Sequence, residues 1–375
     1  MPGARPAYWG FPSSFQTEIP DGLLRVTVAC GSIVTAANRC IEDNSYPGTG
    51  LDIHAVREQH GRSTSSAVGF SPGAIGKILY RNGSRLFRDP ATGRRYDGAI
   101  FYSTQRISSC SGERCGSDGK WIAYTNDGVG FTGHRRILSD CSEVSTEDPH
   151  CRDGSWWCDQ GWPCDSARPR SWWTEGDMSP IYDQGRFLAL AYSYQYARPG
   201  HPLFSNAEVW LLESEDANEW KRSRRVSSAN VEPPYLQRDC VRGAWMMNPD
   251  IARDHAGRYF VTRAYSDNYA GCRVTFPNRV QVYSARDDAA LFHGPWDKVV
   301  DLGCAELGFQ PDSAQILHDG LGRTVASASG ALTLTVAVSG GDWTFSLCGR
   351  EERHPGACGP PPPQRIQEVT IERVR

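Results

Sequence analysis

The chain has 375 residues, of which 39% are hydrophobic and 22% are charged, a balance typical of a globular protein with a sizeable core. The formal net charge is −3, which excludes the strongly basic surface that nucleic acid or an anionic membrane would attract. No stretch approaches the roughly 18 consecutive apolar residues of a membrane span. We therefore expect no nucleic-acid or membrane partner. We also expect a monomer.

Short β-branched and aromatic runs, broken by Gly, Asp and Asn turns, recur along the whole chain, whereas helical periodicity is nearly absent. In chain order the runs cover residues 24–29, 99–102, 121–124, 187–192, 208–212, 259–264, 279–283 and 332–338. Runs of this length and composition are typical of β-strands. The sequence therefore predicts an all-β protein.

One unit occurs three times: an acid, a short apolar strand, an Asp/Gly turn, Gly-Arg and a second strand. Its copies contain Asp177, Asp250 and Asp312. A repeat of this kind predicts a single β-propeller domain. We expect four-stranded blades at 65–138, 172–226, 244–300 and 308–346. A fifth blade would combine 22–35 with 366–374, so that strands from both termini close the ring. Six blades, with the sixth drawn from 36–64, are the alternative.

The chain contains 13 cysteines, and many of them crowd into a loop-rich stretch. Cys141, Cys151, Cys158 and Cys164 lie in a predicted insertion at 140–166. Their spacing lacks the paired Cys-x2-Cys of a zinc site, and we expect disulfides and a secreted, extracellular protein, with a metal cluster as the alternative. Met1-Pro2-Gly3-Ala4-Arg5 has no apolar signal region, so secretion is inferred from the cysteines alone.

The three repeated acids are the candidate catalytic residues. Equivalent positions of different blades converge on the axis of a propeller, so Asp177, Asp250 and Asp312 would meet in one pocket, with Glu175 close by. Carboxylates in one pocket push their pKa values apart, as a general acid and a general base require. The alternative is that each Asp caps a turn. Asp250 is the strongest candidate, and we expect Asp250→Asn to reduce turnover by at least about a hundredfold while leaving the melting temperature almost unchanged.

Aromatic residues crowd the same junctions and predict a binding site for sugars. Trp172, Trp173 and Trp245, together with Asn248, lie beside the acids. Indole faces stack on sugar rings, while nearby polar groups bind the hydroxyls. We expect four other tryptophans to pack between blades instead: Trp210, Trp220, Trp296 and Trp343.

The segment that runs from Asp177 to Phe187, Asp-Met-Ser-Pro-Ile-Tyr-Asp-Gln-Gly-Arg-Phe, resembles a blade opening of the five-bladed propeller glycoside hydrolases. These include the family 43 arabinanases and xylosidases and the related fructosidases. The segments 214–220 (Ser-Glu-Asp-Ala-Asn-Glu-Trp) and 125–131 (Thr-Asn-Asp-Gly-Val-Gly-Phe) resemble the Ser-x-Asp-Gly-x-x-Trp turn of those enzymes. The turn is a structural motif, so it supports the fold more than the activity.

The resemblance implies an Asp base, a tuning Asp and a Glu acid from different blades. Asp177 would be the tuning residue, and Asp250 or Glu175 would belong to the acid/base pair. Glu175-Gly176-Asp177 is the nearest match to the family's Glu-Gly-Pro. The family's Ala-Asp-Pro has no match, and Asp43 and Asp52 are the acids near its expected place.

The sequence predicts no cofactor. The histidines lack zinc-site spacing, and we expect His255 and His318 to lie in surface turns. The alternative is a structural calcium ion in an Asp-rich turn, whose carboxylates are suitable ligands. The predicted function is cleavage of a glycosidic bond in a carbohydrate. The alternatives are a lectin-like propeller that binds glycans without chemistry, and a propeller recruited to lyase or cyclase chemistry.

Overall fold

Strands dominate the computed structural model of the chain. The described residues are 13–19, 22–30, 53–59, 62–67, 77–106, 116–128, 130–138, 173–195, 206–227, 229–231, 247–265, 269–270, 273–275, 279–308, 311–325, 331–338, 343–346, 351–353 and 366–371, and towards the ends of many strands only the backbone is described. Two short helices occur in this part of the chain, α3 (Asp288–His293) and α4 (Cys304–Leu307). None of its helices is long and apolar enough to cross a membrane.

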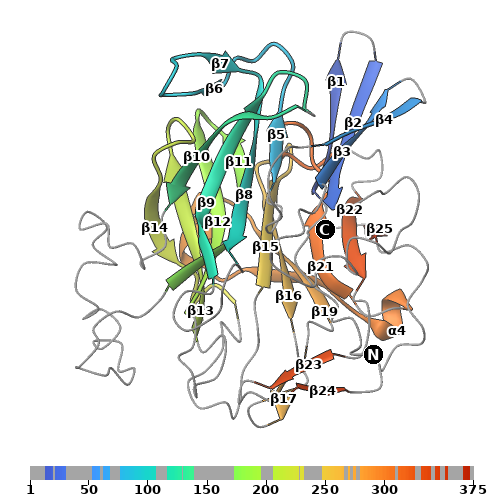
Figure 1. Cartoon of the computed structure of the whole chain (residues 1–375). Coiled ribbons are helices and arrows are strands. Elements are labelled where there is room, and N and C mark those ends of the chain that lie inside the picture. Colours follow the sequence, from blue (N-terminus) through green and yellow to red (C-terminus); the bar gives the residue numbers. More distant parts are fainter. Residues whose placement is uncertain are drawn as a thin grey trace.

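Four consecutive antiparallel sheets over residues 78–371 are arranged as the blades of a β-propeller (Figure 1). The first contains β5 (Ile78–Tyr80), β8 (Gly98–Arg106), β9 (Gly116–Thr125) and β10 (Thr132–Leu138). The second contains β11 (Trp173–Asp183), β12 (Arg186–Gln195), β13 (Asn206–Ser214) and β14 (Lys221–Arg225). The third contains β15 (Met247–Arg253), β16 (Tyr259–Tyr265), β19 (Arg279–Ala285) and β20 (Asp297–Gly303). The fourth contains β21 (Pro311–Ile316), β22 (Leu332–Val338) and β25 (Ile366–Ile371).

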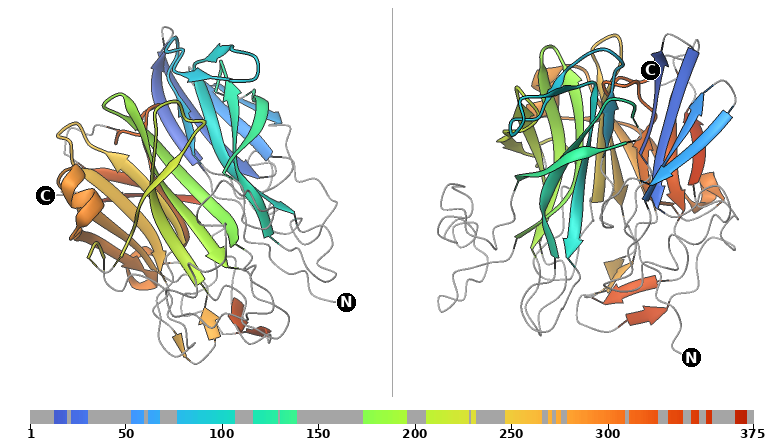
Figure 2. Two further views of the ribbon diagram at one scale, coloured as in Figure 1. Left: turned by 90° about the vertical axis from the view of Figure 1, so that its left-hand side faces the viewer. Right: turned by 45° about the horizontal axis from the view of Figure 1, so that its top comes forward.

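The first strand of each blade is the innermost. β5 contacts β11, β11 contacts β15, and β15 contacts β21, so that these strands surround a common axis. The left-hand view of Figure 2 shows the green sheet of β11–β14 between the cyan sheet and the orange sheets. The predicted propeller is thus present, and three of its sheets cover residues 78–138, 173–225 and 247–303.

The N-terminal strands form a sheet of their own. β1 (Ser13–Ile19), β2 (Gly22–Cys30), β3 (Ile53–Gln59) and β4 (Arg62–Ala67) pair in this order, and β1 lies beside β5. The predicted pairing of 22–35 with 366–374 is wrong, because β25 pairs with β22 instead. The reason lies in the core: Val369 and Ile371 pack against the cluster that contains Leu334 and Val336.

Two smaller sheets lie outside the blades. β17 (Tyr269–Ala270), β18 (Arg273–Thr275), β23 (Trp343–Ser346) and β24 (Glu351–Arg353) form one, and β6 (Phe87–Arg88) and β7 (Arg95–Tyr96) form the other. The expected blade at 308–346 is therefore wrong in part, because β23 leaves it and β25 takes its place beside β22. The predicted insertion at 140–166 lies outside the described residues.

The turn at 214–220 has the structural role that its motif predicts. The Ser214 hydroxyl oxygen accepts from the backbone N–H of Ala217 (2.9 Å), and the Asp216 carboxylate accepts from that of Asn218 (2.8 Å). The ring of Trp220 then packs edge-on against Phe101 of the first blade, with ring centroids 6.0 Å apart. The motif thus closes a hairpin and places an aromatic ring between two blades.

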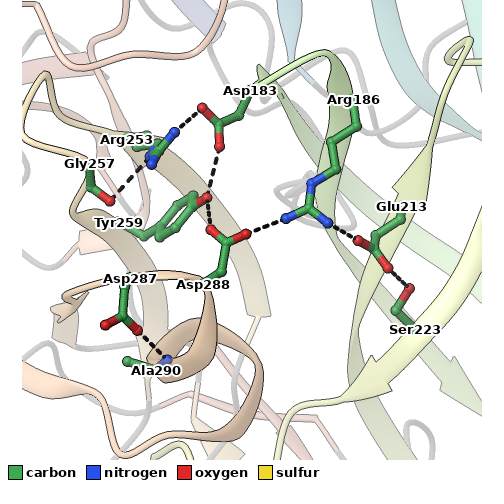
Figure 3. A network of polar contacts seen from close by, with 10 residues as sticks. All are labelled: Asp183, Arg186, Glu213, Ser223, Arg253, Gly257, Tyr259, Asp287, Asp288 and Ala290. Atoms are coloured by element: carbon green, nitrogen blue, oxygen red, sulfur yellow. Dashed lines mark hydrogen bonds and ion pairs between the residues drawn. The ribbon is translucent and has the colours of Figure 1, made fainter.

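A polar network joins the second and third blades near the hairpin that follows β11 (Figure 3). Arg253 pairs with Asp183, and the Tyr259 hydroxyl lies 2.9 Å from Asp183 Oδ2 and 2.5 Å from Asp288 Oδ1. Arg186 continues the network from Asp288. Burial and these two carboxylates raise the pKa of Tyr259 far above its usual value, so its hydroxyl keeps its proton and donates.

Candidate functional site

Asp250 of β15 lies on the axis, where it joins all four blades. Its side chain is only 1% exposed. Oδ1 accepts at 2.9 Å from Nζ of Lys77, the residue just before β5, and it also accepts from the Ser179 hydroxyl of β11. Oδ2 accepts from the backbone N–H of Ile316 in β21 at 2.6 Å. We call these four residues the axial hub.

Lys77 is the cation of the axial hub and is as deeply buried as its partner. Its ammonium also donates to the carbonyl of Ile251. Burial lowers the pKa of Lys77, and the charge of Asp250 and its hydrogen bond to Lys77 oppose this shift. A buried pair of this kind depends on both partners, because either charge alone would be uncompensated.

One end of the axis is filled by the turn that follows β21. The consecutive carbonyls of Gly320, Leu321 and Gly322 accept from the backbone N–H groups of Tyr80 (2.6 Å), Tyr182 (2.9 Å) and Arg253 (3.2 Å), respectively. Asp319 holds the turn, since its Oδ1 accepts from the N–H groups of Leu321 and Arg323, both at 2.8 Å. We call residues 319–323 the axial plug.

His318 lies directly before the axial plug and is buried, so the prediction of a surface turn is wrong for this residue. Its Nδ1 donates to the carbonyl of Asp319, since a carbonyl can only accept. Burial, and secondarily the charge of Lys77, lower the pKa of His318 well below 6.5. His318 is therefore neutral in the folded protein at neutral pH. His255, by contrast, is exposed in the hairpin turn after β15, as predicted.

Acidification should destabilise the protein through His318. Below about pH 6.5 the unfolded chain binds a proton at His318 that the folded protein does not bind. The contribution of neutral His318 to stability is therefore complete above this pH and is lost as the pH falls below it. The expected slope from this one group is up to about 1.4 kcal/mol per pH unit. Denaturant unfolding at pH 7, 6 and 5 measures it. His318→Gln should lose this part of the slope and His255→Gln should keep it; equal slopes in wild type and His318→Gln would contradict the prediction.

The inner strands run in the same direction. Lys77, Ser179, Asp250 and Ile316 meet at the axial hub, and the residues that follow them reach the axial plug. The residues that precede the hub therefore lie toward the opposite end of the axis. Asp177, Asn248 and Asp312 precede it, so the backbone places all three toward this end, which we call the open end.

Each of the three inner strands β11, β15 and β21 has an irregularity in its register near the open end. The shift falls between Glu175 and Met178 in β11, between Met247 and Asp250 in β15, and between Pro311 and Ser313 in β21. Such bulges re-aim side chains and are frequent next to active sites. Asp177 and Asp312 lie inside two of these bulges.

The register shows that Asp250 is not equivalent to the other two acids. Asp250 directly follows the bulge of β15 and lies opposite Thr262, and the residues that directly follow the other two bulges are Met178 and Ser313. The bulge of β15 contains Asn248 and Pro249 instead of an acid. The predicted equivalence of Asp177, Asp250 and Asp312 is thus wrong: Asp250 follows its bulge, whereas the other two acids lie inside theirs, and both its oxygens are bound to other blades.

The remaining predicted site residues are placed by their backbone or not at all. Trp173 and Glu175 lie in β11 before its bulge, while Trp172 and Trp245 lie outside the described residues. Sequence analysis missed Lys77 and Ser179. A signal for Lys77 was present, since it is the one charge in the apolar run Ala74-Ile75-Gly76-Lys77-Ile78-Leu79-Tyr80. No group of residues that could hold a metal ion occurs in the described part of the chain.

No protein-family model and no curated protein matches the chain. Its fold is similar to those of solved structures. The α-L-arabinanase of Penicillium chrysogenum, in complex with arabinobiose, has 11% identity and a TM-score of 0.47, with 96% of this chain and 93% of that chain covered. The GH93 α-L-arabinofuranosidase of Fusarium graminearum, also with arabinobiose, has 11% identity and a TM-score of 0.47, with 96% and 92% covered. A thermostable family-43 glycoside hydrolase has 11% identity and a TM-score of 0.45, with 87% and 83% covered.

The arrangement of its sheets makes the chain a β-propeller, the fold that its sequence predicts. At these identities and TM-scores the likeness to the solved structures assigns no activity.

Proposed function

We propose that the protein is a secreted glycoside hydrolase whose active site lies at the open end of the propeller. The observation that carries the proposal is the set of bulges at this end, two of which contain the acids Asp177 and Asp312. Glu175 precedes the first bulge in β11. The sheet β1–β4 would complete the ring as a fifth blade, because it lies beside β5.

The proposed chemistry needs two carboxyl groups with different protonation states. One protonates the oxygen of the leaving sugar as the glycosidic bond breaks. The other, ionised, either attacks the anomeric carbon or removes a proton from an attacking water molecule. We assign these roles to the set Glu175, Asp177 and Asp312, with Trp172, Trp173, Trp245 and Asn248 as the sugar-binding residues. Asp250 is a positioning residue in this proposal, because its contacts fix the strands that carry the acids.

A screen with chromogenic pentosides, hexosides and polysaccharides tests the function. We expect release of reducing sugar from at least one of them. Binding without turnover would favour the lectin-like alternative, and release of an unsaturated product would favour a lyase. Mass spectrometry without reducing agent tests the proposed secretion, for which we expect disulfides among the 13 cysteines.

Asp177→Asn should reduce turnover by about a hundredfold or more, as loss of a proton-transfer group does, and should leave the melting temperature nearly unchanged. Kinetics on the substrate found in the screen, together with thermal unfolding, measure both effects. Asp254→Asn is the matched control: Asp254 Oδ1 accepts from the Arg258 N–H in the hairpin at the plugged end, so this change should affect stability and not turnover. Full turnover in Asp177→Asn, Glu175→Gln and Asp312→Asn would exclude the proposed site.

A further inference from the structure

The hairpin at residues 81–97, which contains β6 and β7, has an unusual concentration of arginine. It contains Arg81, Arg85, Arg88, Arg94 and Arg95, all of them exposed, and no lysine. We call this segment the arginine hairpin. It connects Tyr80 to Gly98, which pair across β5 and β8. Because Tyr80 binds the axial plug, the arginine hairpin lies at the plugged end of the propeller, away from the proposed active site.

The two acids of the arginine hairpin are used by its own turns. Asp89 is buried and accepts from the Ala91 N–H (2.9 Å) and the Thr92 hydroxyl (2.7 Å). Asp97 is buried and accepts from the N–H groups of Gly83 (3.0 Å) and Arg85 (3.1 Å). The segment therefore has a net charge of +3 in a chain of net charge −3.

Neighbouring acids do not neutralise the arginines at close range. The Asn218 side-chain amide donates to the carbonyl of Arg88 at 3.0 Å, so the turn at 214–220, with its exposed Glu215 and Glu219, is adjacent. Among the described residues, the ion pair within 4 Å that involves these arginines is Arg85 Nε to Asp97 Oδ1 at 3.7 Å, and the Arg85 side chain remains 60% exposed. Arg85 Nη1 and Arg95 Nη1 donate to each other's backbone carbonyls, at 3.2 and 3.3 Å, and all five arginine residues remain exposed.

The backbone holds two like charges directly opposite each other. Arg88 pairs with Arg95 across β6 and β7, while Phe87 and Tyr96 of the same strands are buried. Like charges at opposed positions destabilise a strand pair. Arg85 adds a second unfavourable feature, because its φ of 51° is in the left-handed region that non-glycine residues rarely adopt. The opposed charges and the left-handed conformation each have a cost in stability, so both favour a function for this surface.

We propose that the arginine hairpin binds the carboxylates of an acidic polysaccharide and so holds a polymer at the plugged end. A guanidinium group binds a carboxylate through two parallel hydrogen bonds, which explains the use of arginine in place of lysine. A bound carboxylate between Arg88 and Arg95 would also relieve their repulsion. The choice of a glycan among polyanions rests on the proposed function, whereas the anion site itself does not.

Binding of polygalacturonate to the protein, measured by isothermal titration calorimetry at fixed salt, tests the proposal. The double variant Arg88→Gln/Arg95→Gln should bind about tenfold more weakly or worse, as expected for loss of charge-assisted hydrogen bonds. Its melting temperature should be unchanged or slightly higher, because the like-charge pair is removed. The control Arg286→Gln/Lys298→Gln changes the net charge equally, at exposed residues of the third blade, and should bind like the wild type.

Several outcomes would overturn the proposal. Equal binding by wild type and the arginine double variant would exclude the site, and equal losses in both double variants would show attraction by net charge only. Binding of DNA, dextran sulfate or anionic vesicles that depends on Arg88 and Arg95, in the absence of polygalacturonate binding, would assign a different partner. Polygalacturonate binding that depends on these arginines in a protein that hydrolyses no glycan would refute the proposed function and leave this site in place.

Discussion

Asp250→Ala should lower the free energy of unfolding by about 3–5 kcal/mol, the usual cost of removing one partner of a buried ion pair. The change leaves the Lys77 ammonium, 1% exposed, without its carboxylate. It also removes the acceptor of the Ser179 hydroxyl and of the Ile316 N–H, so contacts between four blades are lost together. Urea unfolding of the purified protein measures the loss.

A double variant separates the charge effect from a general loss of packing. Lys77→Met/Asp250→Leu replaces the pair by apolar side chains, and such replacements are often neutral. We expect it to recover most of the stability lost in Asp250→Ala.

The variant Asp250→Asn distinguishes the two interpretations of this residue. Sequence analysis predicts a normal melting temperature and much reduced turnover, whereas the buried contacts predict a lower melting temperature. A fully stable but inactive Asp250→Ala protein would restore the catalytic interpretation.

Gly322→Ala should destabilise the protein by about 2–4 kcal/mol, from overpacking and an unfavourable backbone conformation together. Gly322 has a φ of 88°, and a Cβ atom at this position would lie 2.4 Å from Ile181 Cγ2 and 3.0 Å from Ile181 Cα. Because Ile181 belongs to the inner strand β11, the clash would push the axial plug away from the strand ends that it binds. Thermal and urea unfolding measure the effect.

Gly185→Ala is the matched control for this prediction. Gly185 has a similar φ of 85°, in the hairpin after β11, but an added Cβ would meet no atom within 4 Å. We expect it to cost only the backbone contribution of about 1–2 kcal/mol. If the two variants lose the same stability, the contact between the plug and Ile181 is unimportant.

The parts of the fold that sequence analysis predicted correctly are those encoded locally. The Gly-Arg hairpins and the Ser214–Trp220 turn lie within a few residues of their partners, so their chemistry is visible in the sequence. The pairing of β22 with β25 joins residues 332–338 to residues 366–371, which are distant in the sequence. It depends on how the apolar side chains of both strands pack in the core, and no local pattern shows this. Residues 62–67, Arg-Ser-Thr-Ser-Ser-Ala, lack the apolar alternation of a strand, and backbone pairing with β3 makes them one.

The candidate site was predicted in part, for a similar reason. The repeat correctly predicted inner strands that converge on an axis, but it aligned Asp250, which follows a bulge, with Asp177, which lies inside one. Bulges have no reliable sequence signal, and in a strand each one-residue shift turns a side chain to the other face. The partners of Asp250 come from three other blades, so no local sequence pattern identifies them.

The position of the axial plug late in the chain has a consequence for synthesis. Residues 319–323 leave the ribosome after the strands β5, β11 and β15 that they bind. Until then the growing chain has made Lys77 and Asp250 but lacks Ile316 and the carbonyls that cap the strand ends. A nascent chain can therefore form its early hairpins, yet its centre stays open to water. Ribosome-bound chains arrested before residue 311 should be far more sensitive to protease than the full chain released from the ribosome, because the last blade covers the inner strands made before it.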